Sequence, residues 1–156
     1  MEKSKNFGNV SVKLLCSVAL LTVVGCVPLG VQNDGLNEAY SELVNQRSSC
    51  LKQSAEGSQF FPDSDWLANL KNEEKQLVVS YLSQYAFNKC LEPQVKHFEQ
   101  ELAKESPSVQ RFIKEQVAMF PYIAQKPDGI DEGQLHNIEI NITRPFIASQ
   151  VYESLK

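Results

Sequence analysis

The sequence predicts an all-α fold, an irregular bundle of four or five helices. Two observations support this prediction. From residue 36 to residue 120, apolar side chains recur at the three- and four-residue spacing of helices that bury one face. Residues typical of helix ends, such as Ser, Asn or Asp before a helix and Pro or Gly after it, interrupt the pattern at intervals. The 156 residues suffice for one domain and are few for two.

The first predicted helix begins near Leu36, after a cap at Asn33 or Asp34, and ends at Glu56-Gly57-Ser58. Its apolar side chains fall on one broad face, which comprises Leu36, Tyr40, Leu43, Cys50 and Leu51.

A loop and a short helix follow, and they carry the densest aromatic cluster of the chain: Phe60, Phe61 and Trp66. Asp63 or Ser64 is suited to cap the short helix. Soluble domains rarely expose large apolar patches, so we expect the three aromatics to belong to the core. The alternative is a contact patch for a partner protein, because aromatic side chains dominate such patches.

Three further helices are predicted before residue 121. The first starts at Asn72 and runs to Cys90. The second starts at Pro93, because proline is favoured in the first turn of a helix. The third starts at Pro107, after a serine cap, and ends before Pro121. A loop with a Pro-Asp-Gly turn follows the third helix.

Residues 137–143 fit two structures. Ile138, Ile140 and Ile142 alternate with polar residues as in a strand, and β-branched residues favour strands. The first and last of these isoleucines also fit a helix. We predict an extended segment, which would have no sheet to join and would be free to pair with the edge of a partner protein. The alternative is an extended segment packed across the bundle. A final short helix is expected before the chain ends.

Residues 1–25 resemble the signal peptide of a bacterial lipoprotein. Three lysines and one glutamate accompany an apolar run from Leu14 to Val24, which is too short to span a membrane. The run leads into Val23-Val24-Gly25-Cys26, which resembles a lipobox. A plain secretory signal has a similar plan and is the alternative.

The lipobox resemblance implies cleavage before Cys26 and lipidation of its thiol. Residues 26–35 would then be a lipidated tether, and residues 36–156 a helical domain. Val27 stands where many lipoproteins retained in the inner membrane have aspartate. The resemblance therefore implies that the protein is anchored at the periplasmic face of the outer membrane.

Cys50 and Cys90 are the two cysteines that remain beyond the lipidated one. Because the signal would send the chain to an oxidising compartment, we expect them to form a disulfide. The alternative is two buried free thiols. No metal site is predicted at either cysteine, because no second Cys or His lies at ligand spacing.

Charge and motifs restrict the function. Without residues 1–25 the formal charge changes from −4 to −6, and the basic residues that remain are scattered. This pattern argues against nucleic acid or anionic lipid as a partner, because both need clustered basic residues. The two histidines, His97 and His136, have no partner at metal-ligand spacing, and no phosphate-binding or nucleophile motif is present. We predict no cofactor, no metal and no enzymatic activity.

A small helical domain with a disulfide and a lipid tether resembles, in architecture, the pilotins, lipoproteins that escort secretion-pore subunits to the outer membrane. The sequence shows no residue motif of the pilotins, so we assign no pilotin site to it. The resemblance implies an adaptor or escort that binds an envelope protein. The candidate contact residues are Phe60, Phe61, Trp66, Ile138, Ile140 and Ile142.

Two other functions stay open. One is a small-ligand-binding or enzymatic lipoprotein with a pocket in the bundle core, near His97 or His136. The other is an inhibitor or immunity lipoprotein.

Overall fold

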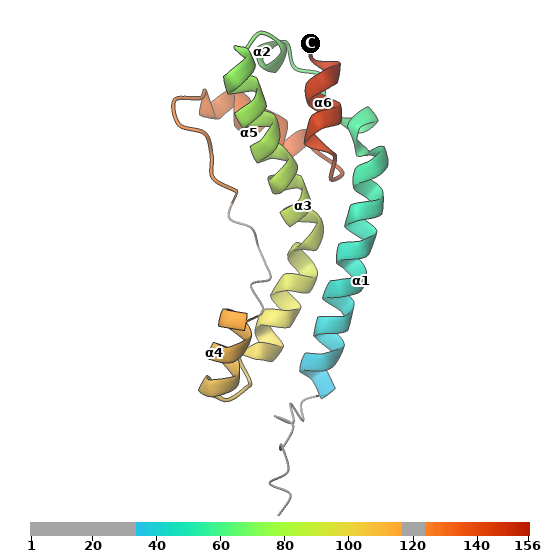
Figure 1. Cartoon of the computed structure of the whole chain (residues 1–156), viewed down its shortest axis with the longest axis vertical. Helices are drawn as coiled ribbons and strands as arrows, with labels where there is room; N and C mark the ends of the chain where they lie inside the picture. The colour runs from blue at the N-terminus through green and yellow to red at the C-terminus, as the bar shows by residue number, and fades with distance from the viewer. Residues whose placement is uncertain (1–33, 117–123) are drawn as a thin grey trace, which may run out of the picture. The chain divides into compact units, whose positions relative to one another are not determined.

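The computed structural model describes residues 34–116 and 124–156, which lie in one compact unit, Val31–Lys156. The predicted signal peptide and lipidation site fall outside these residues, as do Val117 and Phe120 of the predicted helix that starts at Pro107. The described residues contain helices and no strand, which confirms the all-α fold. Their elements are α1 (Asp34–Gly57), the 3₁₀ turn η1 (Ser58–Phe60), α2 (Asp65–Ala68), α3 (Asn72–Leu102), α4 (Pro107–Gln116), α5 (Glu132–Asn141) and α6 (Ala148–Ser154) (Figure 1).

Helices α1 and α3 form an antiparallel pair and lie side by side (Figure 1). Leu43 and Cys50 of α1 are buried against Leu91 of α3 and form a small core between the two helices. Leu43 and Cys50 are seven positions apart, which is about two helical turns, so both lie on the same face of α1.

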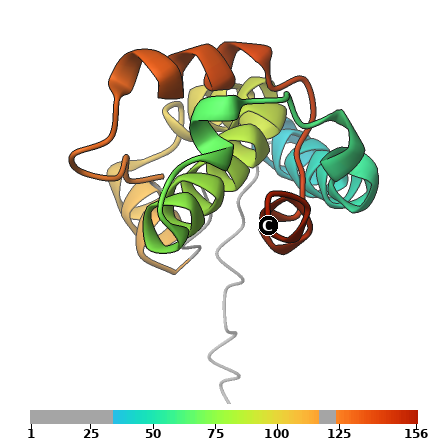
Figure 2. The ribbon, with the colours of Figure 1, turned by 90° about the horizontal axis from the view of Figure 1, so that it is seen from above.

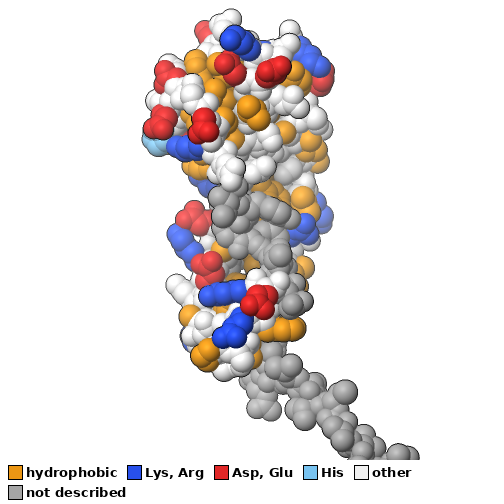
Figure 3. All heavy atoms as spheres, turned by 60° about the vertical axis from the view of Figure 1, so that its left-hand side comes forward, with side chains coloured by type: hydrophobic (Ala, Val, Ile, Leu, Met, Phe, Trp, Pro, Cys, Tyr) orange, Lys and Arg blue, Asp and Glu red, His pale blue; other side chains and the backbone are white. Residues whose placement is uncertain are grey.

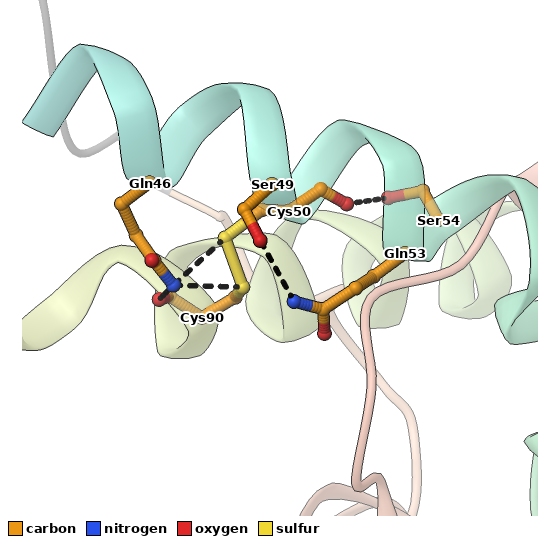
Figure 4. The surroundings of a disulfide bond; sticks show 6 residues. All are labelled: Gln46, Ser49, Cys50, Gln53, Ser54 and Cys90. Atoms are coloured by element: carbon orange, nitrogen blue, oxygen red, sulfur yellow. Dashed lines mark hydrogen bonds between the residues drawn. A yellow bond between two sulfur atoms is a disulfide. The ribbon is translucent and has the colours of Figure 1, made fainter.

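The predicted disulfide joins this pair. Cys50 and Cys90 are bonded, with their Cα atoms 6.2 Å apart. The side-chain amide of Gln46 lies over the bond and donates to the Cys90 carbonyl at 3.1 Å (Figure 4). Ser54 Oγ donates to the Cys50 carbonyl at 2.9 Å. The bond therefore sits in a part of the seam where neighbouring polar groups are also satisfied.

The prediction of a helix break before Pro93 is wrong. Helix α3 continues through Pro93 to Leu102, although an interior proline removes one backbone hydrogen bond and costs about 3 kcal/mol. Packing on both sides of the proline explains the continuity. Leu91 is buried before it, and Phe98 contacts the Tyr40 ring after it, with centroids 6.1 Å apart. Tertiary contacts thus outweigh the local preference of the sequence.

The main core surrounds the first half of α3. Helices α5 and α6 approach α3 from different sides, and the short α2 lies near its start (Figure 2). The serine cap that the sequence predicts for α2 is present, because Ser64 Oγ accepts a hydrogen bond from the Leu67 amide. The buried side chains of this core include Leu67, Val78, Val79, Tyr81, Leu82, Leu135, Ile138, Phe146 and Val151.

Lys75 is buried in α3 and ties two shorter helices to it. Its ammonium donates to the Ala68 carbonyl at 2.9 Å and to the Leu155 carbonyl at 3.1 Å. These carbonyls lie at the ends of α2 and α6, where backbone acceptors have no partner within the helix. The buried charge is therefore satisfied by the two helix ends that it holds together.

The prediction of an extended segment over residues 137–143 is also wrong as far as residue 141. Helix α5 runs to Asn141, and its Asp131 cap accepts a hydrogen bond from the Gln134 amide at 3.0 Å. Ile138 and Ile142 are buried four positions apart, whereas Ile140 is exposed. The helical period therefore prevails over the alternating pattern, and no strand edge is offered to a partner.

Candidate functional site

An apolar groove opens between α1 and α3. Residues 146–148, which lead into α6, complete its wall, and its volume is about 370 Å³. Its apolar lining residues are Leu51, Phe87, Phe146, Ile147 and Ala148.

Two of these side chains remain open to solvent although they are large and apolar. Leu51 is 50% exposed and Ile147 is 38% exposed. Leu51 follows Cys50 in α1, so the two side chains differ by about 100° around the helix. The disulfide directs Cys50 into the seam, and Leu51 is consequently held at its edge.

Three close contacts hold the wall of the groove that residues 146–148 form. Ser83 Oγ donates to the Phe146 carbonyl at 2.9 Å, and the Phe146 ring packs edge-on against Phe61 with centroids 4.9 Å apart. At the end of α1, Gly57 is buried against Pro145, where a side chain would find no room. The groove can accept a large apolar side chain from another molecule, because its apolar floor is fixed and its rim is polar.

The predicted contact residues separate into two groups. Ile138 and Ile142 are buried, and Phe61 and Trp66 are half-buried against the main core. Phe60 and Ile140 are exposed, at 46% and 57%. Phe60 also lies under the Arg144 guanidinium, 4.3 Å from its ring centroid. The structure thus brings most of the aromatic cluster to the core and does not form one surface from the six residues.

Sequence reasoning missed the groove residues Phe87 and Ile147 and assigned Leu51 to the inner face of its helix. One signal was present. The apolar face of α1 that includes Tyr40 and Leu51 is wider than one neighbouring helix can cover, and part of such a face stays exposed. The contribution of residues 146–148 depends on how the chain returns to α1, which no local pattern encodes.

Apart from the groove, a cluster of polar groups lies around Glu139, whose side chain is buried in α5. The Tyr81 hydroxyl donates to Glu139 Oε1 at 2.6 Å, and Lys126 Nζ lies 3.7 Å from the same oxygen. His136 Nδ1 lies 3.4 Å from Glu139 Oε2, with its side chain 67% exposed. Burial and the hydrogen bond to the Glu139 carboxylate raise the pKa of Tyr81 well above its ordinary value.

This cluster connects α3, α5 and the loop that precedes α5, and we expect it to stabilise the fold. Replacement of Tyr81 by phenylalanine should lower the free energy of unfolding at pH 7 by about 2 kcal/mol, because a buried carboxylate loses its donor. Urea unfolding measures the difference. The exposed Tyr40→Phe variant is the control, with an expected change within about 0.5 kcal/mol.

The same variant has a defined pH signature. Because the pKa of Tyr81 is higher in the folded state, its contribution is fully present below the unfolded pKa near 10 and is lost as pH rises toward the folded value. Between pH 8 and pH 10.5 the parent chain should lose about 1 kcal/mol more than Tyr81→Phe. Equal losses in the two chains would show that the hydroxyl is not held by the carboxylate.

The other histidine lies far from this cluster in the chain. His97 Nδ1 is 3.0 Å from Glu42 Oε2 and its Nε2 is 3.9 Å from Glu101 Oε1, so it links the end of α3 to the start of α1. Within residues 34–116 and 124–156, no group of three or more His, Cys, Asp or Glu side chains has the arrangement of a metal site.

Among the helices that the structure describes, none combines the length and the apolar character needed to cross a membrane. Comparison of the chain with models of known protein families, with curated proteins and with solved structures gave no match.

Proposed function

We propose that this chain is an outer-membrane lipoprotein that faces the periplasm and binds an envelope protein as an adaptor or escort. The proposal of the anchor rests on the lipobox-like Val23-Val24-Gly25-Cys26. The proposal of protein binding rests on one observation, the apolar groove between α1 and α3 with Leu51 and Ile147 open to solvent.

The partner segment that fits this groove is amphipathic, with one or two large apolar side chains. The groove runs between two antiparallel helices, and such a seam accepts the apolar face of a third helix. The exposed Gln84 lies among its lining residues, and its amide can meet polar groups at the edge of that segment.

A cross-linking experiment tests the groove directly. A photoreactive amino acid is placed at Leu51 in the full chain, and a second chain carries it at Leu77, which is 60% exposed and lies outside the groove. We expect one dominant envelope protein to cross-link from position 51 and not from position 77. A peptide that spans the cross-linked segment is then titrated into the purified chain.

Replacement of Leu51 by aspartate should lower the affinity for this peptide at least tenfold, which corresponds to about 1.4 kcal/mol of binding free energy. Because half of the Leu51 side chain is exposed, the thermal midpoint should hardly change. The matched control is Leu77→Asp, with unchanged affinity. Equal affinities for the two variants would assign the contact to another surface. Separately, labelled palmitate that is still incorporated after Cys26→Ser would contradict the anchor.

A further inference from the structure

Helix α4 leaves a large aromatic side chain at the surface of the domain. Phe112 is 55% exposed, and Val109 and Ile113 lie half-buried on the same side of the helix. Arg111 and Lys114 are exposed on the other side. The helix is therefore amphipathic, and the domain does not cover its most prominent apolar residue.

The orientation of α4 follows from how it is joined to α3. Gln110 Nε2 donates to the Ala103 carbonyl at 3.4 Å and to the Glu105 carbonyl at 2.8 Å, so this side of α4 faces the end of α3. Residues two positions apart lie on nearly opposite sides of a helix. Phe112 consequently points away from α3.

Helix α4 lies at the end of the domain where α1 begins (Figure 1). The end of α3, which α4 follows, is held to the start of α1 by His97 with Glu42 and by Phe98 with Tyr40. At this end, on the face drawn in Figure 3, hydrophobic side chains reach the surface among basic and acidic ones.

The length of the tether restricts what can cover this surface. Cys26 precedes Asp34, the first residue of α1, by eight positions. An extended chain of this length spans at most about 28 Å. A lipid on Cys26 would therefore hold the start of α1, and α4 with it, close to the headgroups of the bilayer.

We propose that α4 rests on the surface of this bilayer, with the Phe112 ring inserted between headgroups and acyl chains. This inference rests on the lipid anchor of the proposed function. The anchor supplies a high local concentration, so a short amphipathic helix whose own affinity for lipid is weak suffices for contact. Arg111 and Lys114, on the polar side, remain in water or near phosphates.

The contact would also set the position of the groove. Leu51 lies 17 residues after Asp34 in α1, which places it about 25 Å along the helix from the membrane-proximal end. Apolar burial, and not charge, drives the contact, because the chain is acidic. We therefore expect it on zwitterionic as well as anionic vesicles.

Tryptophan fluorescence tests this proposal. The full chain carrying Phe112→Trp is purified from membranes, its acyl group is verified by mass spectrometry, and it is reconstituted into phosphatidylethanolamine–phosphatidylglycerol vesicles with brominated acyl chains. The matched control is Phe60→Trp, at the other end of α1, and the parent chain gives the contribution of Trp66. We expect bromine to quench the added tryptophan at position 112 at least twofold and the one at position 60 hardly at all.

Three results would overturn the inference. First, the acylated chains could show no more quenching of the tryptophan at position 112 than of the tryptophan at position 60. This result would overturn the contact of α4 with the bilayer and leave the anchor intact. A chain without an acyl group would overturn the anchor and the inference together. If Phe112→Glu abolishes cross-linking to the partner protein while position 112 stays unquenched, α4 belongs to a protein interface.

Discussion

Loss of the Cys50–Cys90 disulfide is expected to lower the thermal midpoint by roughly 10–20 °C. The bond closes a loop between residues 40 positions apart, and in the chain-entropy model a loop of this length is worth about 4 kcal/mol. Apart from the cysteines, the core around the bond consists of the buried Leu43 and Leu91, with Phe87, Val95 and Phe98 packed half-buried against them.

The measurement compares thermal unfolding of the chain with and without a phosphine reductant. A Cys50→Ala/Cys90→Ala variant should unfold near the temperature of the reduced parent, and the reductant should not change it further. The double variant thus separates reduction of this bond from other effects of the reagent. A shift of less than about 3 °C would mean that packing of α1 on α3 holds the pair without the bond.

Reduction should also affect the groove before the main core. The bond lies one residue from Leu51, whereas none of the buried side chains of the main core comes from α1. We expect the Leu51 wall to loosen first, because its position depends on the register of α1 against α3.

Local signals in the sequence sufficed for much of the fold. The serine before α2 and the Ser106-Pro107 pair before α4 are helix starts that depend on a few neighbouring residues, and both are present in the structure. The turn at Gly129 is another such case, with a φ of 73° that glycine adopts without strain. The pairing of two cysteines followed from their number and from the compartment that the signal implies.

The errors arose where a tertiary contact outweighed a local preference. Pro93 is a helix-starting residue by position, yet packing against α1 on both sides carries α3 through it. The alternating isoleucines of α5 satisfy two periods at once, and only the position of α3 decides that the helical one is buried. The groove was missed for the same reason, because residues 146–148 reach α1 through a contact far apart in the sequence.

Gly57 is the residue on which that distant contact depends, and Gly57→Ala is expected to lower the free energy of unfolding by about 3 kcal/mol. The backbone at Gly57 is helical, with φ −69° and ψ −25°, so alanine alone would stabilise it by about 0.5–1 kcal/mol. A β-carbon there would lie 1.9 Å from the Pro145 carbonyl oxygen and 2.9 Å from its carbon. Both atoms are backbone, so the segment must move as a whole.

Urea unfolding and peptide titration together identify the cause. The control is Gly133→Ala in the first turn of α5, where the nearest atom to the new β-carbon is a side-chain oxygen of Asp131 at 3.3 Å. Because this glycine is also helical, we expect no loss of stability and a gain of up to about 0.5–1 kcal/mol. Gly57→Ala should also lower the affinity for the partner peptide, because displacement of Pro145 moves the wall formed by Phe146 and Ile147. Leu51→Asp, in contrast, should lower the affinity for the peptide and leave the free energy of unfolding unchanged. A Gly57→Ala chain with full stability and a weakened peptide would mean that residues 145–148 can move away from α1 at little cost.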